Sequence, residues 1–210
     1  DRFVFGGQPS LEAQISNIAD EIAYNHHDLD DGLRSGLITI EEILSLKAAE
    51  DAAKEVLSLR SPQLMDKSRV NSEIIRRMIS SQIEDLVLQT RKNVLSSAVT
   101  SLKDVRSSAN QIVSFSPKTK ENVRELKSFL MRRLYKNPKV RTLTDAAEIV
   151  IEDLFFLFFN EESSEDKDSI KHLRFVADKI AGLTDSSAVK LHRQFFPDKE
   201  LWPDPLFWGK

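Results

Sequence analysis

The feature that most constrains the fold is a run of residues near the start of the chain whose apolar side chains return at helical spacing. The apolar positions of this run are Leu11, Ile15, Ile18 and Ile22. Ser10 is a suitable N-cap residue, so a helix is predicted from there to about Asp28. Turn chemistry follows in the sequence Asp-Asp-Gly at 30–32.

Three polar residues of this predicted helix form a second pattern. Asp20, Tyr24 and Asp28 are spaced i, i+4 and i+8, and therefore lie along one edge of the helix. At the rise of an α-helix the edge is roughly 12 Å long. A carboxylate, a phenol and a second carboxylate in this order could hold a metal at one end and a sugar hydroxyl at the other.

The rest of the chain also favours helix, because only 6 Gly and 7 Pro occur in 210 residues. A capping box at Thr39–Glu42 predicts a helix that extends to the break at Ser61-Pro62. Further helical segments are predicted at about 68–108, 116–137, 144–160, 170–182 and 184–196. No strand-like alternation is present. We therefore predict an all-α, multi-helix bundle of about seven or eight helices.

Composition excludes several kinds of protein. The chain has no cysteine, which rules out disulfides and thiolate metal sites and suits the cytoplasm. It has no apolar run long enough for a membrane span, and its net charge of −3 does not indicate a nucleic-acid binder. We expect 161–168 to be a mobile acidic loop, and Trp202, Phe207 and Trp208 to pack on the body or on another subunit.

Small apolar neighbours single out Asp20 among the carboxylates. Ala19 and Ala23 suggest that this face of the helix is closely packed, and a buried carboxylate needs a cation or a metal as partner. The doublet His27-Asp28 is not predicted to bind metal, and we expect His26 and His27 at a pocket rim or at the surface. An EF-hand at residues 28–39 is rejected, because Leu33 and Thr39 occupy its required Gly and Glu positions.

Four basic clusters are candidates for binding phosphate, since Arg and Lys neutralise the charge on phosphate oxygens. They are Arg76-Arg77, Arg91-Lys92, Arg132-Arg133 and the stretch from Lys136 to Arg141. Most basic pairs on helices are simply solvated, and the sequence does not choose among the four.

Residues 10–33 resemble one protein family over their whole length. The segment is similar to SLEAQ-x-x-N-x-ADEIAY-x-x-HD-x-DDGL of the HD-domain deoxynucleotide triphosphohydrolases, the dGTPase-like enzymes. Residues 126–140 resemble the family's K-x-FL-x-x-x-x-Y-x-x-P-x-V segment, and 175–196 resemble its VADYIAGMTD and LHRRLF close. Lys179 and Leu183 replace the Tyr and the Met that are usual there.

The resemblance implies roles for particular residues. Asp20 would be the last ligand of a divalent metal ion such as Mg²⁺ or Mn²⁺. Tyr24 and Asp28 would line the deoxyribose pocket, the phenol packing on the sugar and the carboxylate binding its 3′-hydroxyl. Asn17 and Glu21 would support them from one turn away. No residue is assigned a catalytic role.

The upstream His and His-Asp ligands of that family are absent from residues 1–210, and the chain begins at Asp1 without Met. We therefore interpret it as the C-terminal half of a metal-dependent enzyme that converts a dNTP to deoxynucleoside and tripolyphosphate. The division expected is 1–60 for the end of the catalytic core and 61–210 for a C-terminal helical region. This fragment alone is predicted to be inactive.

The resemblance implies a dNTP substrate and a homo-oligomer, and it leaves room for dNTP effectors. Two alternative functions stay open. One is a noncatalytic helical module for oligomerisation or for binding a nucleotide effector. The other is a related phosphohydrolase that acts on a different nucleotide, such as a monophosphate.

Overall fold

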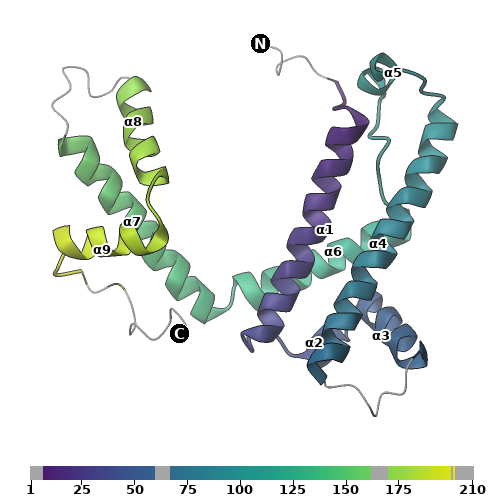
Figure 1. The fold of residues 1–210 in the computed structure, drawn as a ribbon, viewed down its shortest axis with the longest axis horizontal. Helices are drawn as coiled ribbons and strands as arrows, with labels where there is room; N and C mark the ends of the chain where they lie inside the picture. The colour runs from purple at the N-terminus through teal and green to yellow at the C-terminus, as the bar shows by residue number, and fades with distance from the viewer. Residues whose placement is uncertain (1–6, 60–66, 162–169, 200, 202–210) are drawn as a thin grey trace. The chain divides into compact units, whose positions relative to one another are not determined.

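A computed structural model describes residues 7–59, 67–161, 170–199 and 201 of the chain (Figure 1). The described residues contain α-helices and one π-helical segment but no strand, which confirms the all-α prediction. The chain forms two compact units, residues 1–137 and 138–210. The boundary expected after residue 60 was a division by function and stays a prediction, although the helices that flank it pack against each other within unit 1.

The elements follow the chain in order. Unit 1 contains α1 (Leu11–Arg34), α2 (Ile40–Ile43), α3 (Lys47–Leu59), α4 (Lys67–Ser97), α5 (Leu102–Ser107), α6 (Pro117–Leu130) and the π-helical segment η2 (Met131–Tyr135). Unit 2 contains α7 (Pro138–Glu161), α8 (Ile170–Ala181) and α9 (Asp185–Phe195). The expected acidic loop, the aromatic tail and the break at Ser61-Pro62 lie outside the described residues.

Helix α1 begins as predicted but ends later. The Ser10 hydroxyl accepts a hydrogen bond from the Ala13 amide at 3.3 Å and caps the helix. The predicted turn at 30–32 is wrong, because the helix continues to Arg34, which pairs with Asp30 one turn earlier. The chain turns instead at Gly36, whose φ of +70° is costly for other residues.

Three further boundaries differ from the prediction. The capping box at Thr39 is confirmed, but α2 ends at Ile43 and a separate helix, α3, follows. The long predicted helix ends at Ser97, where Ala98 adopts a φ of +51°, and α5 starts afresh from its own capping box at Ser101. Helix α7 starts at Pro138 rather than near residue 144, since proline is well suited to the first turn of a helix.

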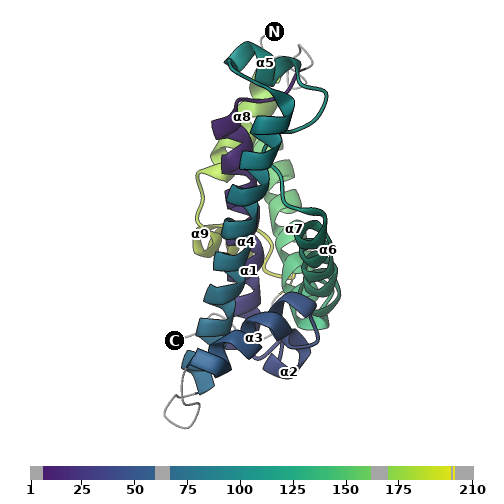
Figure 2. The same ribbon diagram turned by 90° about the vertical axis from the view of Figure 1, so that its right-hand side faces the viewer.

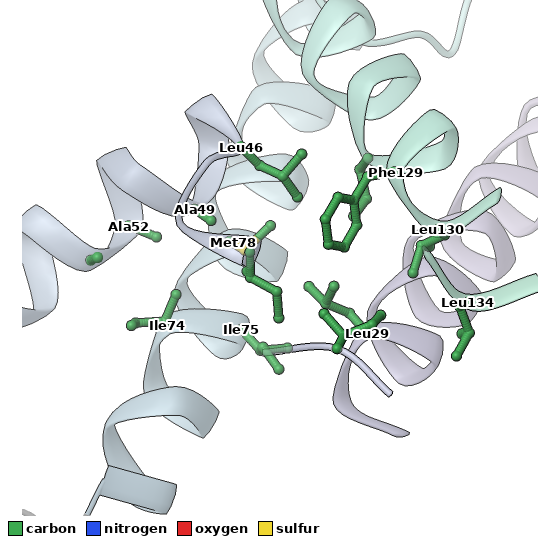
Figure 3. Packing of buried hydrophobic residues seen from close by; sticks show 14 of the residues in the cluster. Leu29, Leu46, Ala49, Ala52, Ile74, Ile75, Met78, Phe129, Leu130 and Leu134 are labelled. Carbon is green, nitrogen blue, oxygen red and sulfur yellow. The ribbon is translucent and has the colours of Figure 1, made fainter. Parts of the chain in front are cut away.

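The core of unit 1 lies where α1, α3, α4 and α6 meet (Figure 3). Leu29 of α1, Met78 of α4 and Leu130 of α6 are each at most 1% exposed. Burying side chains of this size contributes about 1.5–3 kcal/mol each. This cluster therefore fixes the end of α1 against the end of α6.

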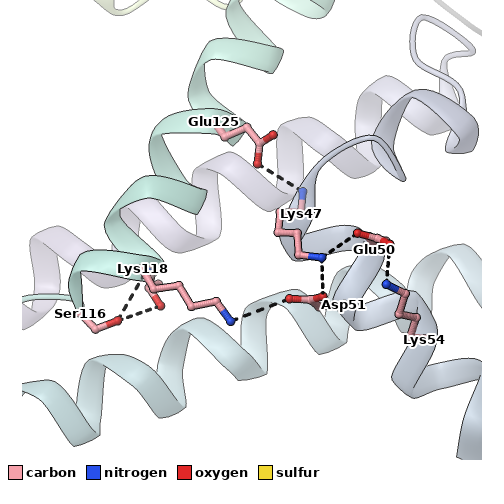
Figure 4. A network of polar contacts seen from close by, with 8 residues as sticks. Lys47, Glu50, Asp51, Lys54, Ser116, Lys118 and Glu125 are labelled. Atoms are coloured by element: carbon pink, nitrogen blue, oxygen red, sulfur yellow. Dashed lines mark hydrogen bonds and ion pairs between the residues drawn. The ribbon is translucent and has the colours of Figure 1, made fainter.

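Polar contacts hold further segments of unit 1 in place. The Lys47 amide at the start of α3 donates to Glu125 of α6 at 3.3 Å, and Asp51 of α3 lies 4.0 Å from Lys118 (Figure 4). The buried side chain of Gln14 in α1 accepts from the amides of Ile112 and Val113, both at 3.0 Å. Because these amides are buried, the glutamine satisfies donors that would otherwise be costly.

Unit 2 has its own core, in which α7 packs against α8 and α9. Leu154 and Val176 are fully buried in it. Beside the core, the buried His192 Nε2 donates to the Asp153 carboxylate at 2.7 Å, and the Lys199 ammonium contacts the same carboxylate at 2.7 and 2.8 Å. One carboxylate thus connects α7, α9 and the segment after α9. Within the described ranges no helix combines the length and the apolar character needed to cross a membrane.

We predict that Gly32→Ala destabilises unit 1 by about 1–3 kcal/mol, because overpacking a filled core has this cost. A Cβ atom at Gly32 would lie 2.5 Å from Cδ1 of Ile38, which is 1% exposed and has little freedom to move. Urea unfolding followed by circular dichroism measures the loss. Ile38→Val removes the clashing methyl group and should recover part of the stability of Gly32→Ala, and absence of any such recovery would contradict the packing argument.

We predict that unit 2 loses stability as the pH falls through the acidic range. Partial burial raises the pKa of Asp153, but hydrogen bonds from Lys199 and His192 outweigh it and hold the pKa below its usual value. Because its pKa is lowered in the folded state, the ionised carboxylate stabilises the fold above the unfolded-state pKa of about 3.9. This stabilisation is lost as the pH falls from there through the folded-state pKa. Unfolding free energies measured between pH 6 and pH 3 should show a smaller decrease for Asp153→Asn than for the unchanged chain.

Candidate functional site

Asp20, Tyr24 and their alanine neighbours form an exposed face of α1. Asp20, Ala19 and Ala23 are all exposed, and Tyr24 is 58% exposed. The close packing expected around Asp20 is therefore absent within the described part of the chain, because no described element covers this face. The Asp20 carboxylate makes no hydrogen bond or ion pair with any other described residue, so its oxygens are free to accept a ligand.

At the Asp28 end of the predicted edge, a tyrosine from a distant part of the sequence contacts α1. The Tyr135 hydroxyl donates a hydrogen bond to the Asp28 carboxylate, across a separation of 107 residues. Burial, followed by hydrogen bonding with Asp28 and Tyr24, raises the pKa of the Tyr135 phenol. Tyr24, Asp28 and Tyr135 therefore form one polar cluster, which we call the tyrosine cluster.

The π-helical segment η2 positions Tyr135 for this contact. Its wider turn is closed by the Lys136 amide, which donates to the carbonyl of Met131, five residues earlier, at 3.1 Å. π-Turns of this kind are frequent at functional sites. Leu134 of the same segment is buried in the unit 1 core. The segment thus fixes one side chain in the core and brings the next to α1.

The two supporting residues behave differently. Glu21, the neighbour of Asp20, pairs with Lys127 of α6 at 2.7 Å. Asn17 is exposed and contacts no described polar group, so its supporting role stays a prediction. Lys127 lies outside the four basic clusters of the sequence, and the structure places it one residue along α1 from the proposed metal ligand.

The two adjacent histidines have opposite environments. His27 is exposed, as expected, but the rim or surface position expected for His26 is wrong, because that side chain is 1% exposed. His26 Nδ1 donates to the Ile22 carbonyl at 2.7 Å, and burial lowers the pKa of the ring. In the described residues no group of three His, Cys, Asp or Glu side chains converges to hold a metal ion.

Several residues of the basic clusters are engaged in ion pairs. Arg77 pairs with Glu55, and Arg133 pairs with Glu42. Arg76 lies 3.3 Å from Glu73, and Arg141 lies 3.4 Å from Asp145. These pairs favour a structural role for the four arginines over the phosphate binding for which their clusters were candidates.

The arrangement has two chemical capabilities. An exposed, unpaired carboxylate at Asp20 can contribute one ligand to a hard divalent cation. The tyrosine cluster, two turns along the same helix, offers hydroxyl and carboxylate groups that can hydrogen-bond a polar ring such as a sugar. Both groups lie on the same helix, one exposed and one partly buried against η2.

Comparison with known proteins finds relatives that match nearly the whole chain. Residues 113–194 match the family model of a phosphohydrolase-associated domain. The chain is 43% identical over 206 residues to a deoxyguanosinetriphosphate triphosphohydrolase-like protein of Thiobacillus denitrificans, covering 96% of this chain and 54% of the relative. A protein of the same name from Azoarcus is 40% identical over 210 residues, with 95% and 53% covered. The chain thus spans about half the length of these relatives.

Sequence reasoning missed Tyr135 and Lys127 as members of the site. Both lie in the segment 126–140 whose similarity to the family was recognised, so the motif contained them. Their contacts to α1 bridge more than 100 residues, and helical periodicity carries no information about such pairs. The sequence signal that could have found them was the motif itself. Core packing does not require a lysine at 127 or a tyrosine at 135, so their presence in the motif pointed to another role.

We predict that Tyr135 keeps its proton well above pH 10 in the folded chain. The chain has only two tyrosines, so Tyr24→Phe leaves Tyr135 as the sole phenol, still with burial and the Asp28 contact raising its pKa. A pKa raised in the folded state stabilises the fold below the unfolded-state pKa of about 10, and this contribution is lost as the pH rises above it. Tyrosinate absorbance measures the titration.

The control for this titration is the same variant with Asp28→Asn added, which should titrate at a lower pH because the neighbouring negative charge is gone. The same Tyr24→Phe variant unfolded in urea gives the reference pH at which Tyr135 ionises. If Tyr135 ionised at that same pH in the folded variant, the tyrosine cluster would be contradicted.

Proposed function

Because the chain belongs to the family of the deoxyguanosinetriphosphate triphosphohydrolase-like proteins, we propose that the whole protein is a metal-dependent dNTP triphosphohydrolase. The reaction releases a deoxynucleoside and intact tripolyphosphate. One observation carries the proposal: the tyrosine cluster lies on the same helix as Asp20, about two turns away, and Asp20 is exposed and pairs with no described residue. This arrangement suits a molecule that has a sugar hydroxyl at one end and a metal-bound phosphate at the other.

We assign Asp20 as a ligand of a divalent metal ion. The residue fits this role in its chemistry and its exposure, since Mg²⁺ and Mn²⁺ prefer oxygen ligands. When bound, the ion would polarise a phosphate oxygen and orient the attacking water. A useful site needs about three protein ligands. The described residues offer one, so the remaining ligands must come from elsewhere, and we expect residues 1–210 alone to be inactive.

The tyrosine cluster is assigned to the sugar. Asp28 is a carboxylate with about four lone-pair positions, so it can accept from Tyr135 and from a sugar 3′-hydroxyl together. The Tyr135 hydroxyl holds the Asp28 carboxylate in place, and Tyr24 provides the aromatic face for close packing against a 2′-deoxy carbon. Lys127 pairs with Glu21, the neighbour of Asp20, and so connects this part of α1 to α6.

A cavity in unit 1 supports the second candidate function, binding of a nucleotide effector. It has a volume of about 1040 Å³ and is lined by elements α1, α4 and α6 and by the segment from Ser108 to Phe115. Ile112, Val113 and Phe115 are its buried apolar residues, while α6 contributes Lys120 and also Arg124, which pairs with Glu121. An apolar floor beside cations suits a base and its phosphates.

The experiment that tests the main proposal is hydrolysis of the four dNTPs by the full-length protein with Mg²⁺ or Mn²⁺, with tripolyphosphate as the measured product. We predict that Asp20→Ala reduces this release by at least about 100-fold, because the metal loses a ligand. Asp178→Ala is the matched control, since it removes an exposed helical carboxylate in unit 2 and should leave activity unchanged.

Each outcome separates the functions under consideration. Tripolyphosphate release that is unchanged in Asp20→Ala would overturn the metal assignment but not the reaction. Release of inorganic phosphate from a nucleoside monophosphate would favour the related phosphohydrolase. Absence of hydrolysis for every dNTP and dNTP mixture, together with dNTP binding that Lys120→Glu weakens, would favour the effector-binding module.

A further inference from the structure

Helix α4 carries an exposed face that no described element of unit 1 covers. Its buried residues Ile74, Met78, Gln82 and Leu86 point into the unit. The other side of the helix presents Glu84, Val87, Leu88, Arg91 and Leu95, which recur at helical spacing and which we call the outer face of α4. Figure 2 shows α4 at the outside of unit 1, with α1 behind it.

The outer face of α4 presents three exposed apolar side chains between its charged ones. Val87 is 44% exposed, Leu88 is 59% exposed and Leu95 is 82% exposed. A single exposed apolar residue needs no explanation, but a group of them on one helical face is typical of an interaction surface. Glu84 and Arg91 flank the central pair, and neither forms an ion pair with a described residue.

The order of these residues makes the outer face complementary to itself. A two-fold axis that crosses α4 between Val87 and Leu88 relates positions equally far from it in two antiparallel helices. Glu84 of one copy then faces Arg91 of the second copy, and Arg91 faces the second copy's Glu84. Leu95 faces Ser80, whose small side chain leaves room for it. A parallel arrangement would instead set Glu84 against Glu84 and Arg91 against Arg91.

We propose that the outer face of α4 is an antiparallel, two-fold contact between two copies of this chain. The central apolar pair supplies the buried area, and the two Glu84–Arg91 pairs fix the register and exclude the parallel arrangement. One helical face from each copy is a small interface, since stable dimers bury about 1,200–2,000 Å². We therefore expect a dimer that dissociates at micromolar concentrations. The inference is independent of the proposed hydrolase function.

Cysteine cross-linking tests the contact directly, because the chain has no cysteine of its own. Leu88→Cys places a thiol beside the axis, so two copies should join under oxidation or with a short thiol cross-linker. In the matched control Leu95→Cys the two thiols would be about 22 Å apart, at 1.5 Å per residue, and should not join. Residue 95 is the more exposed of the two, so random collision would give the opposite result.

A charge exchange tests the register. Glu84→Arg should raise the dimer dissociation constant, measured by sedimentation equilibrium, by about 10-fold or more, because it sets like charges together at two places. Glu84→Arg combined with Arg91→Glu should restore it to within about 3-fold of the unchanged chain. Glu41→Arg, an exposed change in α2, serves as the control and should leave it unchanged.

Three results would overturn the proposal. A chain that stays monomeric at all concentrations would show that another partner or another segment covers the outer face of α4. Equal cross-linking at positions 88 and 95 would indicate a parallel or a non-specific contact. A dimer that is insensitive to both Glu84→Arg and Leu88→Lys would place the interface elsewhere.

Discussion

The packing of α1 against the end of α6 is the interaction on which the rest of unit 1 depends. Leu29 and Leu130 are both fully buried in the core that joins the two helices. Asp28 precedes one of these leucines, and Tyr135 comes one helical turn after the other. The hydrophobic contact therefore brings the polar cluster together, and the hydrogen bond between Asp28 and Tyr135 sets its orientation. The tyrosine cluster thus lies directly beside the apolar core of unit 1 and is positioned by it.

Local features of the sequence predicted most of the helices, because local interactions determine where those helices begin. Ser10, Thr39 and Ser116 each cap a helix in the structure, as their position before an apolar-periodic run suggested. The errors occurred where tertiary contacts override local preference. The Asp-Asp-Gly sequence at 30–32 remains helical because Gly32 packs closely against Ile38, and no local pattern reveals that contact.

The candidate site was predictable only in part, and for a similar reason. Asp20, Tyr24 and Asp28 lie on one helix, so their spacing alone placed them along one edge. Tyr135 reaches that edge from η2, and Lys127 reaches the neighbouring Glu21 from α6, so both contacts depend on how distant helices pack. The burial of His26 likewise depends on neighbours that periodicity does not identify, since adjacent residues of a helix differ in direction by about 100°.

The π-turn of η2 has a consequence for how this chain can change in length. A π-turn holds one residue more than the α-helical turn it replaces, so it acts as an insertion that the helix has absorbed. Deleting one residue between Met131 and Leu134 would let a regular α-helical turn form there and would change the direction of Tyr135 only a little, whereas a deletion inside the regular helix α6 would turn every later residue by about 100°. The segment η2 can therefore lose one residue at less cost to the tyrosine cluster than α6 can, and this turn is the place where the chain between the core and Tyr135 can change in length.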